Sequence, residues 1–108
     1  MSELLKGIDI SFWQRNDFKR LIDEHAPDFV IARATFSKTV DGTCDAIYQY
    51  AKGLGKKLGF YMFPLTSDGT PEESAEWNYN QVRGYIGEAI PMLDWEATAG
   101  TDATNVDW

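Results

Sequence analysis

Two carboxylates stand one residue apart near the C-terminus, inside a short apolar run. The run reads PMLDWEAT over residues 91–98, and its acids are Asp94 and Glu96. If the run is a strand, its side chains alternate, so both acids share one face with their Cα atoms roughly 6.5–7 Å apart. Two ionised carboxylates at that spacing repel each other when partly desolvated, so that one holds a proton at neutral pH. A protonated acid beside an ionised carboxylate is the pair that cleavage of a glycosidic bond requires.

The same spacing also has a purely structural interpretation. Acidic residues at the end of a strand often take part in ion pairs that stabilise a fold and do no chemistry. Arg33, which lies in another apolar run, can neutralise one of the acids in either case. The pattern alone therefore leaves a catalytic pair and a structural ion-pair network open.

Apolar runs of strand length alternate with amphipathic segments along the chain. The sequence predicts strands over residues 7–11, 28–36, 57–64 and 90–96, and helices over residues 16–25, 43–55 and 70–87. Asn16 is the predicted N-cap of the first helix, and Thr70 followed by Pro71 predicts the start of the third. Strands that alternate with helices connect by right-handed crossovers into a parallel sheet, so the predicted fold class is α/β.

Such a sheet would bring the candidate site residues to one edge. In parallel α/β folds the chemistry gathers at the carboxyl ends of the strands. Asp94 and Glu96 end the predicted fourth strand, and Asp9 lies near the end of the first. Tyr61 and Phe63 end the third. Aromatic side chains there can line a cleft for a sugar, although aromatic residues at strand spacing also serve as core.

Composition limits the classes of function. The chain has 108 residues and a formal net charge of −7, which suits one small domain and argues against nonspecific binding to nucleic acid or to an anionic membrane. It has one cysteine, Cys44, and one histidine, His25, so we expect neither an intrachain disulfide nor a metal site. Cys44 is predicted to be buried in the core, and His25 to be structural. The sequence shows no apolar run long enough to insert into a membrane and no signal peptide, which predicts synthesis in the cytoplasm.

Five segments of the chain together resemble glycoside hydrolase family 25, the lysozymes of the muramidase type found in phage endolysins, bacteria and some fungi. The matching segments, in the family's order and at the expected spacing, are KGIDISFWQ, DFVIARAT, YAKGLGKKLGFYMF, EESAEWNY and PMLDWE. Two positions depart from the resemblance, because Phe36 stands where many relatives have Glu and Met62 where many have His. Met62 alternates away from Tyr61 and is predicted to face the helices, whereas Phe36 is placed to reshape the cleft.

The resemblance implies a peptidoglycan hydrolase that cleaves the β-1,4 bond between N-acetylmuramic acid and N-acetylglucosamine, without a metal or cofactor. It implies that Glu96 is the general acid, Asp94 the companion carboxylate and Asp9 a further acid of the site. A protein without a signal peptide would act on the cell wall only after release from the cell that makes it. The predicted substrate-binding residues are Tyr61, Phe63 and Arg33.

Length sets the last expectation. The family forms an irregular β/α barrel of about twice this size, and a closed barrel has eight strands, whereas about half that number is predicted here. Residues 1–108 are therefore predicted to be the N-terminal half of the catalytic domain. A lone half-barrel leaves two strand edges unpaired, which predicts self-association or pairing with a missing C-terminal half. The alternative to an active hydrolase is an inactive half-domain that binds glycan or assembles with a partner half.

Overall fold

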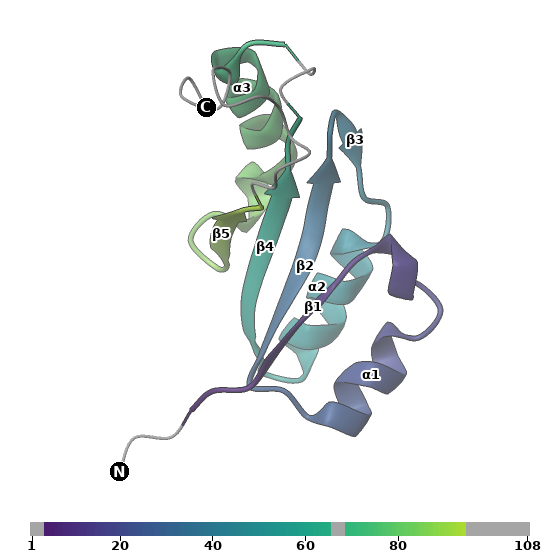
Figure 1. Cartoon of the computed structure of the whole chain (residues 1–108). Coiled ribbons are helices and arrows are strands. Elements are labelled where there is room, and N and C mark those ends of the chain that lie inside the picture. The colour runs from purple at the N-terminus through teal and green to yellow at the C-terminus, as the bar shows by residue number, and fades with distance from the viewer. Residues whose placement is uncertain (1–3, 66–68, 95–108) are drawn as a thin grey trace.

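The fold is built on one mainly parallel sheet. The structure, a computed structural model, describes residues 4–65 and 69–94 (Figure 1). Within these residues the strand order is β1-β2-β4-β5, and each neighbouring pair in that order is parallel. The strand bounds are Gly7–Ile10 for β1, Phe29–Phe36 for β2, Lys57–Phe63 for β4 and Ile90–Leu93 for β5. All four predicted strands are confirmed as far as they are described; residues 95 and 96 of the predicted fourth strand lie outside the described residues.

In the described part of the chain, three α-helices connect the parallel strands. They are α1 over Phe18–His25, α2 over Cys44–Gly53 and α3 over Pro71–Val82. The Thr70 hydroxyl accepts a hydrogen bond from the Glu73 amide at 3.1 Å, so Thr70 caps α3 as the sequence predicts. Within the described ranges, no helix combines the length and the apolarity needed to cross a lipid bilayer.

Two predicted helix ends differ in the structure. The prediction of Asn16 as an N-cap is wrong, because Asp17 occupies that position and makes no side-chain cap bond. Asn16 instead belongs to the preceding turn, in which the Asp17 amide donates to the Gln14 carbonyl oxygen at 3.0 Å. The third helix ends earlier than residue 87, because the chain passes at Val82 into the 3₁₀ turn η3 over Arg83–Tyr85.

The sequence prediction omits two short elements. The 3₁₀ turn η1, over Phe12–Gln14, is held by a reciprocal cap in which the Ser11 hydroxyl accepts from the Trp13 amide and Gln14 Oε1 accepts from the Ser11 amide. The strand β3, over Thr39–Val40, pairs antiparallel with the end of β2. A two-residue strand has no alternation to detect, whereas η1 carries its signal in the Ser-x-x-Gln spacing.

The hydrophobic core lies on one face of the sheet, between the strands and the helices. Alternate strand residues point into it, and Ile10, Val30 and Phe60 are all buried there. Cys44 of α2 is also buried, as predicted, and this burial raises the pKa of its thiol to about 12. The helices contribute Phe18, Ile22, Ile47, Ala51 and Val82.

No described helix packs on the opposite, open face of the sheet. This open face carries side chains that are exposed or only half-buried, namely Asp9, Ile31, Arg33, Tyr61 and Met92. Helices on a single face are typical of a β/α barrel, whereas a doubly wound sheet has helices on both faces. The structure therefore confirms an α/β fold of the barrel type, here an open sheet equivalent to about half a barrel.

A register shift near the end of β2 changes which residues face the helices. Arg33 lies opposite Tyr61 of β4, but Thr35, not Ala34, lies opposite Met62. Thr35 is fully buried, and its hydroxyl donates to Asn78 Oδ1 of α3 at 2.6 Å. This buried hydrogen bond ties α3 to the sheet just before β2 ends.

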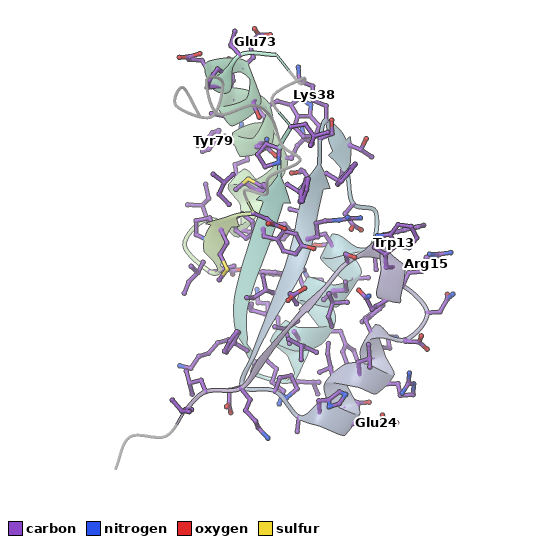
Figure 2. The ribbon with its side chains drawn as sticks, in the orientation of Figure 1. Trp13, Arg15, Glu24, Lys38, Glu73 and Tyr79 are labelled. Carbon is purple, nitrogen blue, oxygen red and sulfur yellow. The ribbon has the colours of Figure 1, made fainter. Side chains whose placement is uncertain are left out.

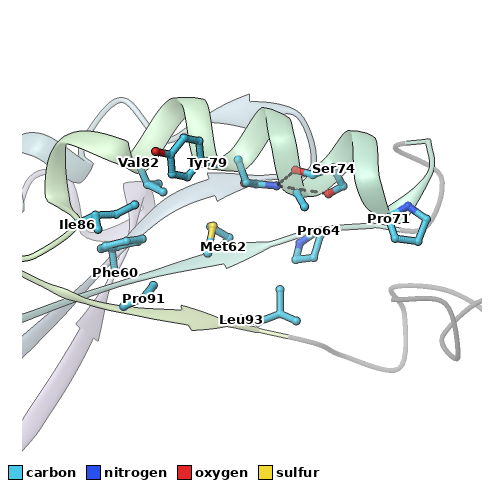
Figure 3. A pocket seen from close by; sticks show the side chains of 12 residues that line it. Phe60, Met62, Pro64, Pro71, Ser74, Tyr79, Val82, Ile86, Pro91 and Leu93 are labelled. Carbon is cyan, nitrogen blue, oxygen red and sulfur yellow. Dashed lines mark hydrogen bonds between the residues drawn. The ribbon is translucent and has the colours of Figure 1, made fainter.

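An apolar groove lies between α3 and the strands β4 and β5 (Figure 3). Its volume is about 390 Å³, and Phe60 and Met62 of β4 point into it together with Pro91 and Leu93 of β5. Met62 thus faces the helix side of the sheet, as predicted. Pro91 and Leu93 are exposed, so the core is open along this edge of the sheet.

Candidate active site

Asp9 reaches the open face through strand alternation in β1. Its neighbours Ile8 and Ile10 pack on the core, and Ile10 is 2% exposed. The parallel register of β1 with β2 places Asp9 opposite Ile31. The Asp9 side chain is therefore presented to solvent from the first strand of the sheet.

Asp94 follows β5 directly. Its amide donates to the Met62 carbonyl oxygen of β4 at 2.9 Å, which continues the parallel pairing beyond Leu93. Alternation along β5 places Met92 and Asp94 on the open face, while Leu93 points to the apolar groove. The β4–β5 pairing thus orients the Asp94 side chain toward the same face as Asp9.

Asp9 and Asp94 line one hollow, although the strands that carry them are at opposite ends of the sheet order. We call this hollow the acidic depression; its volume is about 300 Å³, and it is also lined by Ile31, Tyr61, Met92 and Leu93. Neighbouring strands lie about 4.8 Å apart, so three steps across a flat sheet would separate β1 from β5 by roughly 14 Å. Two carboxylates on so small a hollow indicate a curved sheet whose open face is concave. Curvature of that sense is what a barrel requires.

The Tyr61 hydroxyl remains protonated in the acidic depression. Burial raises the pKa of this hydroxyl above its usual range; the positive charge of Arg33 opposes the rise, and the negative charges of Asp9 and Asp94 add to it. A neutral phenol can donate a hydrogen bond, whereas a carboxylate only accepts hydrogen bonds. Tyr61 therefore complements Asp9 and Asp94 as a potential donor to an oxygen of a bound ligand.

Arg33 forms its ion pair with an acid that the sequence analysis does not single out. Its Nε donates to Asp41 Oδ2 at 3.0 Å, and the Asp41 side chain is fully buried. Asp41 also accepts hydrogen bonds from the amides of Phe12 and Thr43, each at 2.9 Å. Within residues 4–65 and 69–94, the ion pair of Arg33 is therefore with Asp41 and not with Asp9 or Asp94, whereas Glu96 lies outside the described residues. The signal for Asp41 is local, since Asp-Gly-Thr is a typical turn in which Asp bonds the amide two residues on.

Phe63 is placed beside the acidic depression without lining it. Its ring stacks on Phe36, with centroids 5.2 Å apart and an angle of 25° between the planes. Phe36 is 43% exposed and Phe63 is half-buried, so Phe36 is the outer of the two rings. Phe63 thus supports Phe36, and Phe36 meets solvent.

Glu96, the predicted general acid, lies outside the described residues. In residues 4–65 and 69–94, no cluster of three or more His, Cys, Asp or Glu side chains is arranged to hold a metal ion. The described part of the site therefore offers two carboxylates, a protonated phenol and nearby aromatic rings at the carboxyl edge of a concave sheet. Such a surface suits a ligand with many hydroxyl groups and apolar faces.

The concave parallel sheet, the single layer of helices and the acids at the carboxyl ends of the strands define an open scaffold of the β/α-barrel type. The sequence profile described as glycosyl hydrolases family 25 matches residues 8–108. The chain belongs to this family.

Individual relatives agree with this assignment. The autolytic lysozyme of Clostridium acetobutylicum is 33% identical over 97 residues, which are 89% of this chain and 29% of that protein. A muramidase structure from Acremonium alcalophilum has a TM-score of 0.75 at 22% identity, and covers 97% of this chain and 56% of its own. The structure of the modular autolysin LytC from Streptococcus pneumoniae, in complex with a synthetic peptidoglycan ligand, has a TM-score of 0.71 at 24% identity, over 95% of this chain and 27% of its own. The two solved structures establish the shared fold, and the chain spans between about a quarter and a half of these relatives.

Proposed function

We propose that this chain supplies the acid-bearing part of a peptidoglycan hydrolase that cleaves the β-1,4 bond between N-acetylmuramic acid and N-acetylglucosamine. The observation that carries the proposal is the convergence of Asp9 and Asp94 in one depression of a family 25 sheet. The names of the relatives, an autolytic lysozyme and a muramidase, support the same class of reaction.

Each acid has a distinct role in the proposed reaction. Glu96 donates a proton to the glycosidic oxygen as the bond to the anomeric carbon breaks, and water finally adds to that carbon. Asp94 carries the negative charge that stabilises the oxocarbenium-like sugar, and Asp9 adds to the negative field of the depression. Tyr61 donates a hydrogen bond to a sugar oxygen beside them. Arg33 and Phe63 contribute to substrate binding at the border of the acidic depression.

We further propose that residues 1–108 are the N-terminal half of the catalytic domain and that the acting species is paired. Within the described residues, β1 and β5 each have a strand on one side only, and the apolar groove is open along β5. Pairing of these edges, with the C-terminal half or with a second copy of this chain, would bury the groove and close the cleft against water. We also propose that the protein acts on the cell wall after its release from the cell that makes it.

The test is release of reducing sugar ends from purified peptidoglycan. We would compare the chain and its Glu96→Gln variant, each alone and each joined to the C-terminal region of the Clostridium acetobutylicum relative. The proposal predicts release by the joined parent and loss of at least about a hundredfold in Glu96→Gln, with unchanged thermal unfolding. Equal release by both forms, or equal loss of folding, would refute the role of Glu96.

A second candidate function is glycan binding without hydrolysis. It is favoured by the observation that the chain covers only 29% of the autolytic lysozyme and 56% of the muramidase. A half-domain with an open cleft can hold glycan without turning it over. This candidate predicts binding to peptidoglycan by the chain alone, with no reducing ends released by any of the four proteins.

A further inference from the structure

Asp41 is a buried carboxylate that does not line the acidic depression. It follows β3 directly, and its amide donates to the Ala34 carbonyl oxygen of β2 at 2.8 Å. The two oxygens of its side chain accept from the amides of Phe12 and Thr43, each at 2.9 Å. Phe12 lies 29 residues away in the chain, in the turn η1 that Trp13 marks in Figure 2. Hydrogen bonds from two separate segments therefore fix this carboxylate in place.

The same carboxylate holds the side chain of Arg33. Arg33 Nε donates to Asp41 Oδ2 at 3.0 Å, and the Arg33 side chain is only 15% exposed. Its guanidinium carbon also lies 5.4 Å from the centroid of the Phe36 ring, within the range of a cation–π contact. Arg33 is the direct register partner of Tyr61, which lines the acidic depression. Asp41 therefore decides where a largely buried positive charge stands relative to Tyr61.

Arg33 and the acids of the depression lie within electrostatic reach of one phenol. Burial raises the pKa of the Tyr61 hydroxyl; the charge of Arg33 opposes the rise, whereas those of Asp9, Asp94 and Asp41 add to it. Among the described residues, neither Asp9 nor Asp94 has an ion-pair partner. A guanidinium released from Asp41 would therefore be attracted to them, since a charge-assisted contact is strong where water is partly excluded.

We propose that Asp41 is a positioning residue of the acidic depression. By holding Arg33 beside Tyr61, it keeps the guanidinium from pairing with the acids of that hollow. Asp9 and Asp94 thereby keep the negative charge that the proposed reaction uses. The part that Asp41 plays in hydrolysis rests on the proposed function, whereas its hold on Arg33 can be tested without any turnover.

A second guanidinium lies on the same turn as Phe12. The Arg15 guanidinium carbon stands 4.1 Å from the centroid of the Phe12 ring, and its Nη1 donates to the Phe12 carbonyl oxygen at 3.3 Å. Arg15 is exposed, and Figure 2 shows it beside Trp13. Its charge is the same in every variant below, so a comparison with and without Arg33 isolates the contribution of Arg33.

The experiment is an NMR titration of the chain with ¹³Cζ-labelled tyrosine, in which the Tyr61 signal is identified by its loss in Tyr61→Phe. The ionised fraction of Tyr61 is compared between variants over the pH range in which the far-UV circular dichroism stays constant. In Asp41→Asn the freed Arg33 joins the acids beside Tyr61, so the pKa of this phenol falls. Loss of the Asp41 charge also lowers this pKa directly, and the same change in an Arg33→Met chain measures that direct effect alone. The proposal predicts a smaller fall when residue 33 is Met.

Two controls separate positioning from a general loss of stability. Asn78→Ala also removes a buried hydrogen bond, the one from the Thr35 hydroxyl at 2.6 Å, but on the helix side of the sheet. This variant should leave the ionisation of Tyr61 as it is in the parent. Within each sample, the pKa of Tyr50, which its hydrogen bond to Asp23 raises, should not change.

Several results would overturn the proposal. One is an equal change of Tyr61 with and without Arg33, and another is the same change in Asn78→Ala. A rise in the pKa of Tyr61 would also overturn it, because Arg33 would then have left for solvent. If Asp41→Asn does not fold, Asp41→Ser takes its place, since a hydroxyl can still accept from the Thr43 amide. Failure of both variants to fold would make Asp41 a structural residue only.

The titration needs no bond cleavage, so it separates this inference from the proposed function. In the joined chain of the wall assay, Asp41→Asn should slow the release of reducing ends at least about tenfold. The expected response of Tyr61 with no release by the joined parent would refute the hydrolase and leave the hold of Asp41 on Arg33 standing. Equal release by the joined parent and its Asp41→Asn variant would refute the positioning role and leave the hydrolase standing.

Discussion

Asp41 is a fully buried carboxylate, and its replacement by Asn should strongly lower the free energy of unfolding. In Asp41→Asn the fully buried carboxylate loses its charge, and one oxygen becomes an amide nitrogen that faces other donors. Three hydrogen bonds are affected, from Arg33 Nε and from the amides of Phe12 and Thr43. The perturbation therefore loosens β2, η1 and the turn after β3 together.

The expected size follows from the burial of the pair. Removing one partner of a buried ion pair costs about 3–5 kcal/mol, since the other charge is left without compensation. Arg33 retains 15% of its side-chain exposure and can regain some hydration, so we expect the low end, about 3 kcal/mol in the free energy of unfolding. For a domain of this size that lowers the thermal midpoint by roughly 12–20 °C.

The assay is chemical denaturation of the parent, Asp41→Asn, Arg33→Met and the double variant. If the Arg33–Asp41 ion pair accounts for the effect, Asp41→Asn lowers the free energy of unfolding by at least about 1.5 kcal/mol less in a chain that already carries Arg33→Met than in the parent. Amide hydrogen exchange should become faster at Phe12 and Thr43 first. A loss under about 1 kcal/mol, or additive effects in the cycle, would refute the assignment of Asp41 as the group that positions Arg33.

Two further predictions concern side-chain contacts of α3 with β2 and of α2 with the loop before β5. Asn78→Ala leaves the fully buried Thr35 hydroxyl without its 2.6 Å partner, so we expect a loss of about 2 kcal/mol in urea denaturation, and a loss below about 0.5 kcal/mol would contradict this. The hydrogen bonds from Tyr48 and Lys52 lower the pKa of the Glu88 carboxyl, so its stabilising effect is complete above the ordinary Glu range and is lost as pH falls through the lowered pKa. Thermal midpoints measured against pH should therefore show Glu88→Gln below the parent near neutrality and equal to it in acid; a constant difference would argue against the linkage.

Most of the elements follow from local sequence pattern. Apolar runs of strand length predicted β1, β2, β4 and β5, because strands buried against helices need a continuous supply of Val, Ile, Phe and Ala. Thr70 predicted the start of α3, because its cap is made within a single turn. The family could also be predicted from the sequence, because its five matching segments coincide with the strands and helices and keep their order along the chain.

Other features of the site depend on residues far apart in the chain. Arg33 pairs with Asp41 because the β2–β3 hairpin brings the two side chains together. The two-residue strand β3 is too short to show a periodic pattern in the sequence, so this pairing could not be predicted. The stacking of Phe36 on Phe63 follows the register shift in β2, a property of two paired strands.

The sequence by itself determined which residues are acids, which segments are strands, and which ends of those strands carry the candidate acids. Those properties are local, because alternation and capping act over a few neighbouring residues. Only the tertiary structure decided that Asp9 and Asp94 share one depression and that Phe36 of β2 stacks on Phe63 of β4. Both results come from the curvature and register of the whole sheet, which arise from packing between strands that no single segment encodes.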